Sequence, residues 1–253
     1  MAELTDWVID CGNTAVKWAI FQGDHCLGHG TDPNFNEMLS ASGEPAGIAV
    51  AASGVVPAAI SGLRERFPRA RMALLTPADF QRAFPIEYSP ALGLGLDRWA
   101  NAASAKAWDS KGTVVVIDAG TCLTVEVVVG GTFHGGSISP GLALRLEAMA
   151  SGTAALPDLS QDELPGAIDL AERSTRGAML AGALGGMRLE IEGRLREFGK
   201  VWPDLTVLLT GGDASHLQLP EQYRIFADPL LTLKGIRIIY QALGDAQSPQ
   251  YHP

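Results

Sequence analysis

The chain has 253 residues, of which 47% are hydrophobic and 19% charged, and its formal net charge at pH 7 is −9. This is the composition of a globular protein with one large domain or two medium ones. The acidic excess argues against nucleic acid or an anionic membrane as the main partner. No apolar run approaches the roughly 20 residues of a membrane helix, and the acidic N-terminus lacks a signal-peptide pattern. We therefore expect a cytoplasmic protein.

The first strand pattern ends in a carboxylate and a glycine. An apolar run leads into Asp10-Cys11-Gly12-Asn13-Thr14, and a second run extends to Phe21. This predicts a hairpin with polar groups at its neck. A carboxylate at a strand end lies at the rim of a sheet, glycine lets the backbone approach a ligand, and the N–H groups of the turn can hold an anion. Ordinary turn chemistry is the alternative.

Lys17 follows on the second strand of this hairpin. Alternation places Lys17 on one face with Ala15 and Ala19, and places Val16, Trp18 and Ile20 on the other. A lysine near the turn could pair with a phosphate oxygen. A solvated strand lysine is the alternative, and the spacing alone does not decide between them. The three cysteines, Cys11, Cys26 and Cys122, form no C-x-x-C pair and are interpreted as small buried residues.

Short strands then alternate with helices. We expect helices over residues 33–42 and 56–67 and strands over 48–52 and 73–75. This order is typical of an α/β architecture.

Residues 77–96 are rich in Pro and Gly and are interpreted as a shaped loop before Asp97-Arg98 and an alanine-rich helix over 99–108. Asp97 could accept a proton from a substrate hydroxyl, and Arg98 could bind a substrate carboxylate. The alternative is an N-cap Asp followed by a surface Arg.

The second half begins as the first does. A β-branched run ends in Asp118-Ala119-Gly120-Thr121, and residues 125–129 form the next run. Such an internal repeat indicates two related halves. Two hairpins of this kind facing each other would hold phosphates from both sides, with a cation between carboxylates and phosphate oxygens. The repeat favours a nucleotide site over a simple turn.

Three further segments of the second half carry possible site residues. The glycine-rich residues 135–141 precede a helix over 142–149 and could present N–H groups to an anion. Thr175 lies at the start of a long helix to about residue 198, whose small residues indicate either a dimer seam or an intrachain contact and whose Arg194 and Arg196 are interpreted as solvated. A strand over 207–209 leads into Thr210-Gly211-Gly212-Asp213, where a flat ligand or a simple turn would fit. The last helix is expected over 233–243.

In this order the motifs resemble those of the type III pantothenate kinases, of the acetate-kinase, sugar-kinase, Hsp70 and actin superfamily, over essentially the whole chain. The matches are D-x-G-N-T-x-x-K at residues 10–17, Y-x-x-P…G-x-D-R at 88–98, the second phosphate motif at 118–124, G-G-x-I-x-P-G at 135–141, and the adenosine motif at 210–213. The resemblance implies a duplicated ribonuclease-H-like (actin-like ATPase) fold. Its two mixed-sheet halves, 1–112 and 113–253, would flank a central cleft.

The resemblance also implies the function and the role of each residue. The reaction would be ATP-dependent phosphorylation of pantothenate, the first step of coenzyme A biosynthesis, with Asp97 as general base. The residues expected to bind ATP are Asp10, Cys11, Gly12, Asn13, Thr14, Ala15, Val16, Lys17, Thr121, Gly211 and Gly212. Those expected to bind pantothenate are Tyr88, Gly95, Leu96, Asp97, Arg98 and Thr175, the last from the facing subunit of a homodimer. Asp118 would hold K⁺ or NH₄⁺, and Asp10 would hold Mg²⁺ through the phosphates.

Some residues depart from the family pattern. Pro90 follows Tyr88 by two positions instead of three, Cys122 replaces a usual Ala, and Glu126 stands where the family often has Asp. Leu94 and Leu96 make the substrate loop more apolar than usual.

Two other functions stay open. One is a related kinase or phosphatase that acts on a sugar or polyphosphate, against which the carboxylate pocket of Tyr88 and Arg98 argues. The other is a non-catalytic nucleotide-binding regulator, against which the intact Asp10, Asp97 and Asp118 argue.

Overall fold

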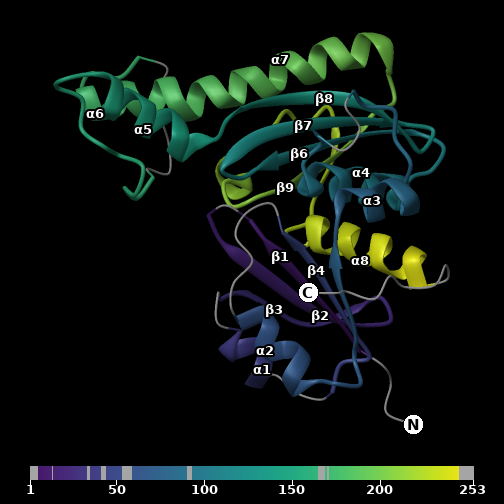
Figure 1. Cartoon of the computed structure of the whole chain (residues 1–253). Helices are drawn as coiled ribbons and strands as arrows, with labels where there is room; N and C mark the ends of the chain where they lie inside the picture. Colours follow the sequence, from purple (N-terminus) through teal and green to yellow (C-terminus); the bar gives the residue numbers. More distant parts are fainter. Residues whose placement is uncertain are drawn as a thin grey trace. The chain divides into compact units, whose positions relative to one another are not determined.

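The structure is a computed structural model that describes residues 5–12, 14–32, 35–40, 44–52, 59–89, 93–164, 169 and 171–244. Its internal contacts divide the chain into two units, Met1–Trp108 with Leu230–Pro253 and Asp109–Pro229. Each unit is built on one five-stranded sheet (Figure 1). Within the described ranges, no helix is both long and apolar enough to cross a membrane.

The first unit contains a mixed sheet of order β3-β2-β1-β4-β5. Strands β1, β2 and β3 are antiparallel neighbours, whereas β4 and β5 run parallel to β1. Its elements are β1 (Thr5–Cys11), β2 (Val16–Gln22), β3 (His25–Thr31), α1 (Asn36–Ser40), β4 (Gly47–Ala52), α2 (Ala59–Arg66), β5 (Arg71–Leu75), α3 (Pro77–Ala83), α4 (Leu96–Trp108) and α8 (Leu231–Gly244).

The second unit contains a sheet of order β10-β9-β6-β7-β8. Strands β6, β7 and β8 are antiparallel neighbours, and β9 and β10 run parallel to β6. Its elements are β6 (Thr113–Ala119), β7 (Cys122–Val129), β8 (Thr132–Pro140), α5 (Leu142–Gly152), α6 (Thr175–Leu180), the π-helical segment η2 (Ala181–Gly185), α7 (Gly186–Val201), β9 (Thr206–Thr210), the 3₁₀ turn η3 (Ala214–His216) and β10 (Arg224–Ala227).

The two sheets have the same topology. Each starts with a three-stranded antiparallel meander and adds two strands parallel to the first, so β1 corresponds to β6 and β4 to β9. Asp10 is the penultimate residue of β1, and Asp118 is the penultimate residue of β6. This confirms the predicted duplicated ribonuclease-H-like fold.

Alternating side chains of the first sheet form a core on one of its faces. Trp7, Ile9, Trp18 and Ile20 are buried there, together with side chains of α1 and α2. The predicted alternation along β2 is confirmed, because Val16, Trp18 and Ile20 belong to this cluster.

Helix α8 covers the other face of the first sheet, although it follows the whole second sheet in the sequence (Figure 1). Asp6 on β1 accepts hydrogen bonds from Arg237 and Gln241 of this helix, and Tyr240 lies against Gly47. The division predicted from the repeat, into residues 1–112 and 113–253, stays a prediction. No signal in the sequence indicated that α8 packs on the first sheet.

The core of the second unit lies between the sheet and its long helical segment. Val115, Ile117 and Ala119 of β6 pack there with alternate residues of β7 and β9. The helical residues of this core recur every three or four positions: Leu180, Leu184, Met187, Ile191 and Leu195. In Figure 1, α7 runs beside β8, and α5 and α6 lie near its N-terminal end.

The structure corrects two predicted segments. Residues 77–96 are not one loop, because they contain α3, whose capping box joins Thr76 and Asp79 and whose first turn contains Pro77. The glycine-rich segment before α5 is not a turn, because residues up to Pro140 belong to strand β8.

The predicted long helix after Ser174 is present but is interrupted by η2. Ser174 is its N-cap and accepts a hydrogen bond from the Gly177 N–H. A Cβ atom added at Gly182, Gly185 or Gly186 would meet no atom within 4 Å. An alanine side chain at these three glycines would therefore contact no described residue, whereas Ala183 of the same segment is buried in the core of the unit.

Tyr240 and Arg71 fasten α8 to β5. The Tyr240 hydroxyl accepts a hydrogen bond from Arg71 Nε at 2.8 Å and donates one to the Arg71 carbonyl, and the guanidinium lies 4.1 Å from the ring centroid. We predict that Tyr240→Phe lowers the free energy of unfolding by about 1–2 kcal/mol, because both hydrogen bonds are lost. Urea unfolding measures this. Tyr223→Phe is the control, since that hydroxyl makes no hydrogen bond with the described residues, and an equal loss in both variants would contradict the role of Arg71.

Candidate active site

The first phosphate motif places a carboxylate opposite a lysine. In the antiparallel register of β1 and β2, Asp10 lies opposite Lys17, and both are half-buried. Opposed residues of an antiparallel pair share a face, with Cβ atoms roughly 5 Å apart. On its other side Asp10 is paired with Ala51 of β4, whose small side chain leaves room on this face. The structure thus brings Asp10 and Lys17 together on one face of the sheet.

The turn after Asp10 is closed by its own backbone. The Gly12 N–H donates to the Ala15 carbonyl at 3.1 Å. Thr14 is exposed, and Asn13 lies outside the described residues. The Cys11 side chain is fully buried, and this burial and the charge of Asp10 raise the pKa of its thiol to about 11. Only the backbone of Cys11 can therefore face a ligand.

The other two cysteines differ from the prediction. Cys26 is exposed on β3, and Cys122 is only half-buried. Each cysteine lies on a different strand, and the distance between them along the sequence does not indicate whether a side chain points into the core or to solvent.

Asp97 and Arg98 lie in the first turn of α4, which begins at Leu96. The Arg98 N–H donates to Asp97 Oδ1 at 2.8 Å. The Arg98 side chain is only 5% exposed, so the alternative of a surface arginine is wrong.

Tyr88 lies beside this arginine. Its hydroxyl is 3.5 Å from Arg98 Nη1, and the guanidinium carbon is 5.8 Å from its ring centroid. The structure therefore brings together three of the residues predicted to bind the substrate, all in the first unit. Pro90 lies outside the described residues.

Gly95 leaves space for the Asp97 carboxylate, between two buried leucines of the chain. A Cβ at residue 95 would lie 2.5 Å from Asp97 Oδ1, so the glycine makes room for the carboxylate. Leu94 and Leu96, which depart from the family pattern, are buried.

The second phosphate motif has the same layout with a different partner. Asp118 of β6 is paired with Thr124 on β7 and with Thr210 on β9. The Gly120 N–H donates to the Cys122 carbonyl at 3.2 Å, and Thr121 is exposed at the turn. Thr124 Oγ1 is buried and has no hydrogen-bond partner among the described residues. A neutral oxygen thus lies opposite Asp118, where the first motif has a lysine.

The adenosine motif lies directly against the second phosphate motif. The Asp213 N–H donates to the Ala119 carbonyl at 2.9 Å. Gly211 has a φ of +98°, and a Cβ there would lie 2.3 Å from the Ala119 carbonyl carbon. Gly212 is exposed. The backbone contact explains the first glycine of Thr-Gly-Gly-Asp, and the structure brings the two motifs together.

Asp213 also links this motif to helix α5. Burial raises the pKa of its carboxyl, while the charge of His216 and a hydrogen bond from the Leu142 N–H act in the opposite direction. Leu142 is the first residue of α5, so Asp213 accepts a bond from an otherwise unpaired helix N-terminus.

The glycines in and after strand β8 lie against the turn of residues 120–122 and against strand β7. The Gly141 N–H donates to the Thr121 carbonyl at 3.0 Å, and a Cβ at Gly141 would lie 2.2 Å from the Gly120 oxygen. Gly136 lies opposite Glu126, and its Cβ would be 2.7 Å from Glu126 Oε2. Glu126 is completely buried, and the bare backbone of Gly136 makes room for its longer side chain.

Thr175 is exposed at the first position of α6. It lies in the second unit, whereas Tyr88 and Arg98 lie in the first. Among the described residues, no group of three or more His, Cys, Asp or Glu could hold a metal ion.

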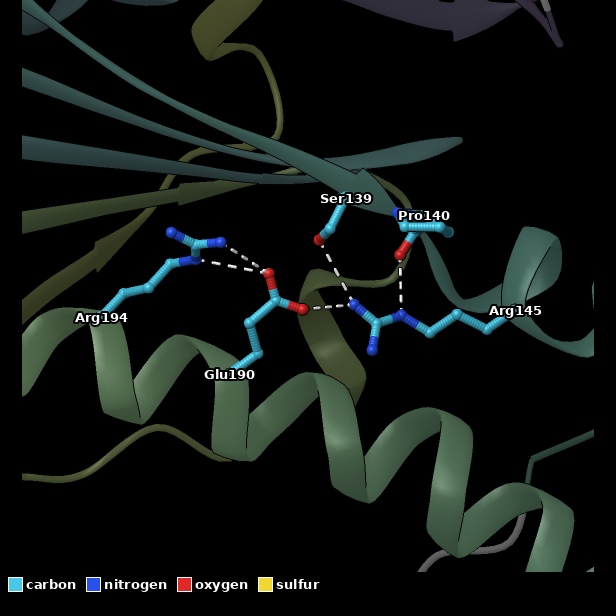
Figure 2. Close-up of polar contacts among 5 residues, drawn as sticks. All are labelled: Ser139, Pro140, Arg145, Glu190 and Arg194. Carbon is cyan, nitrogen blue, oxygen red and sulfur yellow. Dashed lines mark hydrogen bonds and ion pairs between the residues drawn. The ribbon is translucent and has the colours of Figure 1, made fainter.

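Sequence reasoning missed one polar network. Arg194 was interpreted as solvated, yet it is paired with Glu190, which is also paired with Arg145 (Figure 2). The i,i+4 spacing of Glu190 and Arg194 was a signal for the first pair. The contact with Arg145 joins two different helices and has no such signal.

Solved structures share this fold. A Baf family protein from Campylobacter jejuni superposes with a TM-score of 0.57 at 20% identity, covering 96% of this chain and all of that one. The activator of the 2-hydroxyisocaproyl-CoA dehydratase from Clostridium difficile superposes with a TM-score of 0.51 at 13% identity, covering 99% and 100%. The duplicated sheets, with one aspartate turn each, have the actin-like ATPase fold.

The sequence comparisons identify the family within that class. The type III pantothenate kinase family model matches residues 7–197. Type III pantothenate kinases from Christiangramia forsetii and Cytophaga hutchinsonii are 30% and 31% identical, each match covering 92% of this chain and 97% of the relative. The enzyme from Phocaeicola vulgatus is 39% identical over 154 residues, which are 60% of this chain and 62% of that relative. The chain belongs to the type III pantothenate kinase family, and it is a kinase.

The contact between Gly211 and Ala119 can be tested with a matched pair of glycines. We predict that Gly211→Ala lowers the free energy of unfolding by about 3 kcal/mol or more, because the new Cβ meets backbone at a positive φ. Gly212→Ala is the control, since a Cβ there meets no atom within 4 Å. Chemical denaturation of both variants measures the difference. Equal stabilities would show that the adenosine motif does not pack on Ala119 as described.

Proposed function

We propose that the chain transfers the γ-phosphoryl group of ATP to the primary hydroxyl of pantothenate, giving 4'-phosphopantothenate. The observation that carries this is the grouping of Asp97, Arg98 and Tyr88 in a chain of this kinase family. A carboxylate next to a buried cation suits an acceptor that carries both a hydroxyl and a carboxylate, as pantothenate does. The function is therefore the first step of coenzyme A biosynthesis.

Asp97 is the proposed general base. Its Oδ1 accepts the Arg98 N–H, which fixes the carboxylate at the start of α4. As the pantothenate hydroxyl oxygen bonds to the γ-phosphorus, its proton passes to Asp97, and the bond from that phosphorus to the ADP oxygen breaks.

Arg98 and Tyr88 are the proposed carboxylate-binding residues, helped by Gly95 and Leu96 of the same loop. Arg98 is buried, and a buried cation attracts an anionic substrate group more strongly than one in water. The Tyr88 hydroxyl, 3.5 Å from Arg98 Nη1, is a second donor next to it.

The two aspartate turns are the proposed ATP-binding elements. Lys17 would neutralise phosphate charge beside Asp10, with the turn of residues 11–16 next to the phosphates, and Thr121, Gly211 and Gly212 would contact the nucleotide. Mg²⁺ would be held by the phosphates and Asp10. When bound, Mg²⁺ neutralises the charge of the transferring phosphoryl group.

Asp118 is the proposed ligand of a monovalent cation, K⁺ or NH₄⁺. The residues fit such an ion, because the buried Thr124 Oγ1 has no hydrogen-bond partner among the described residues and lies on the strand opposite Asp118. Hard cations bind carboxylate and hydroxyl oxygens of this kind.

A homodimer is the proposed assembly. Thr175 is exposed, and Gly182, Gly185 and Gly186 have space in front of them that no described residue fills. A facing copy of α6 and η2 would cover these glycines and carry its Thr175 toward the substrate.

ADP release from the purified chain tests the reaction. With ATP and Mg²⁺, we expect turnover that depends on pantothenate and that is faster in K⁺ than in Na⁺ buffer, because K⁺ is one of the two ions proposed to bind Asp118. Release without pantothenate dependence, but with a sugar or polyphosphate, would indicate a related kinase. Nucleotide binding without any turnover would indicate a regulator.

Replacement of the base tests its role separately. We predict that Asp97→Asn lowers kcat by about 10²–10⁴-fold with little change in either KM, because the amide has the same shape but accepts no proton. Asp158→Asn, at an exposed carboxylate that accepts the Ser160 N–H, is the control. If Asp97→Asn keeps full activity with a normal melting temperature, Asp97 is not the base.

A further inference from the structure

A network of ions and hydrogen bonds in the second unit joins three elements. Arg145 on α5 donates from Nε to the Pro140 carbonyl at 2.7 Å and from Nη2 to Ser139 Oγ at 3.3 Å, both on β8. The same Nη2 donates to Glu190 on α7, and Glu190 also accepts two hydrogen bonds from Arg194 (Figure 2). The guanidinium of Arg145 thus bridges β8 and α7.

Gly141, which follows β8, connects this network to the second phosphate motif. Pro140 and Ser139 are the last residues of β8, and they are paired with Cys122 and Leu123 of β7. The next residue, Gly141, donates its N–H to the Thr121 carbonyl and touches the Gly120 carbonyl so closely that no side chain would fit. The end of β8 is therefore in direct backbone contact with the turn of residues 120–122.

The charges of the network suit a rigid support. Burial raises the pKa of Glu190, but hydrogen bonds from Arg145, Ser139 and Arg194 outweigh this effect and hold it below its ordinary value. Side-chain exposures of 20% for Arg145 and 22% for Glu190 set this pair apart from Lys200–Glu197 on the same helix, which is more than 60% exposed at both partners. The partly desolvated pair is held more firmly than a surface ion pair.

We propose that Arg145, held in place by Glu190, is a positioning residue that fixes the turn of residues 120–122 for ATP through the end of β8. This rests on the proposed function in one respect, namely that Thr121 contacts ATP. Arg145 acts through the backbone of Pro140 and Gly141.

The test is nucleotide affinity in variants that separate charge from geometry. Arg145→Gln removes the bonds to Pro140 and Ser139. We expect the Kd for a non-hydrolysable ATP analogue, measured by titration calorimetry, and the KM for ATP to rise about tenfold. The KM for pantothenate should change less than twofold. Arg145→Lys keeps a cation facing Glu190 but has no Nε to hold Pro140, so we expect it to recover thermal stability without recovering nucleotide affinity.

Two matched controls lie on α7. Arg194→Gln removes the other partner of Glu190, and Glu197→Gln removes an exposed ion pair, and both should leave nucleotide affinity unchanged. Hydrogen exchange of residues 120–123 should become faster in Arg145→Gln and stay unchanged in the controls. Unchanged affinity in Arg145→Gln, or affinity restored by Arg145→Lys, would overturn the proposal.

A measurement on the wild-type chain does not depend on the folding of the variants. Adding the ATP analogue should shift the NMR signal of the Arg145 Nε–H, while that of Arg176, which is bonded to Asp162, should not move. A static Arg145 signal, or no nucleotide binding at all, would overturn the proposal. Nucleotide binding with these shifts but no pantothenate-dependent turnover would reject the proposed phosphoryl transfer to pantothenate and leave the role of Arg145 standing.

Discussion

Contact between bare backbones is the constraint on which the candidate nucleotide-binding edge of the second unit depends. Gly211 and Gly141 each bring backbone so close to Ala119, Gly120 and Thr121 that a Cβ would lie within 2.6 Å of a carbonyl atom. Both contacts are made where strands end. There the carbonyl groups of Ala119 and Thr121 accept hydrogen bonds from the N–H groups of Asp213 and Gly141. Such an edge can present N–H groups to a ligand without a side chain in the way.

The fold could be predicted because its strongest signals are local. The Val-Ile-Asp-x-Gly repeat, with a β run on each side, was sufficient to predict two related hairpins, and the identical strand orders confirm them. Helix α3 was missed although Thr76, Pro77 and Asp79 carry a complete capping box. The proline and glycine content of the following residues outweighed that signal, and a local start signal is the better guide to a short helix.

The candidate site could be predicted only as far as strand register and motif order reach. Asp10 opposite Lys17 follows from alternation along a hairpin, and the structure has this pair. The burial of Arg98 and the pairing of Glu190 with Arg145 depend on contacts between elements, about which the spacing of charges along the chain says nothing. A charged residue near a helix start or on a helix face therefore needs tertiary structure before it can be placed inside or outside.

Duplication gives the two units the same position for a carboxylate, but the residue opposite that carboxylate decides what each turn can bind. Beside Asp10, Lys17 supplies a fixed positive charge, which suits phosphate oxygens. Beside Asp118, Thr124 supplies a neutral oxygen that has no hydrogen-bond partner among the described residues. A carboxylate and a hydroxyl together form an oxygen-only surface, which favours a cation over a phosphate. The proposed difference in ligand between the two turns therefore rests on the residue paired with each aspartate, Lys17 on β2 and Thr124 on β7.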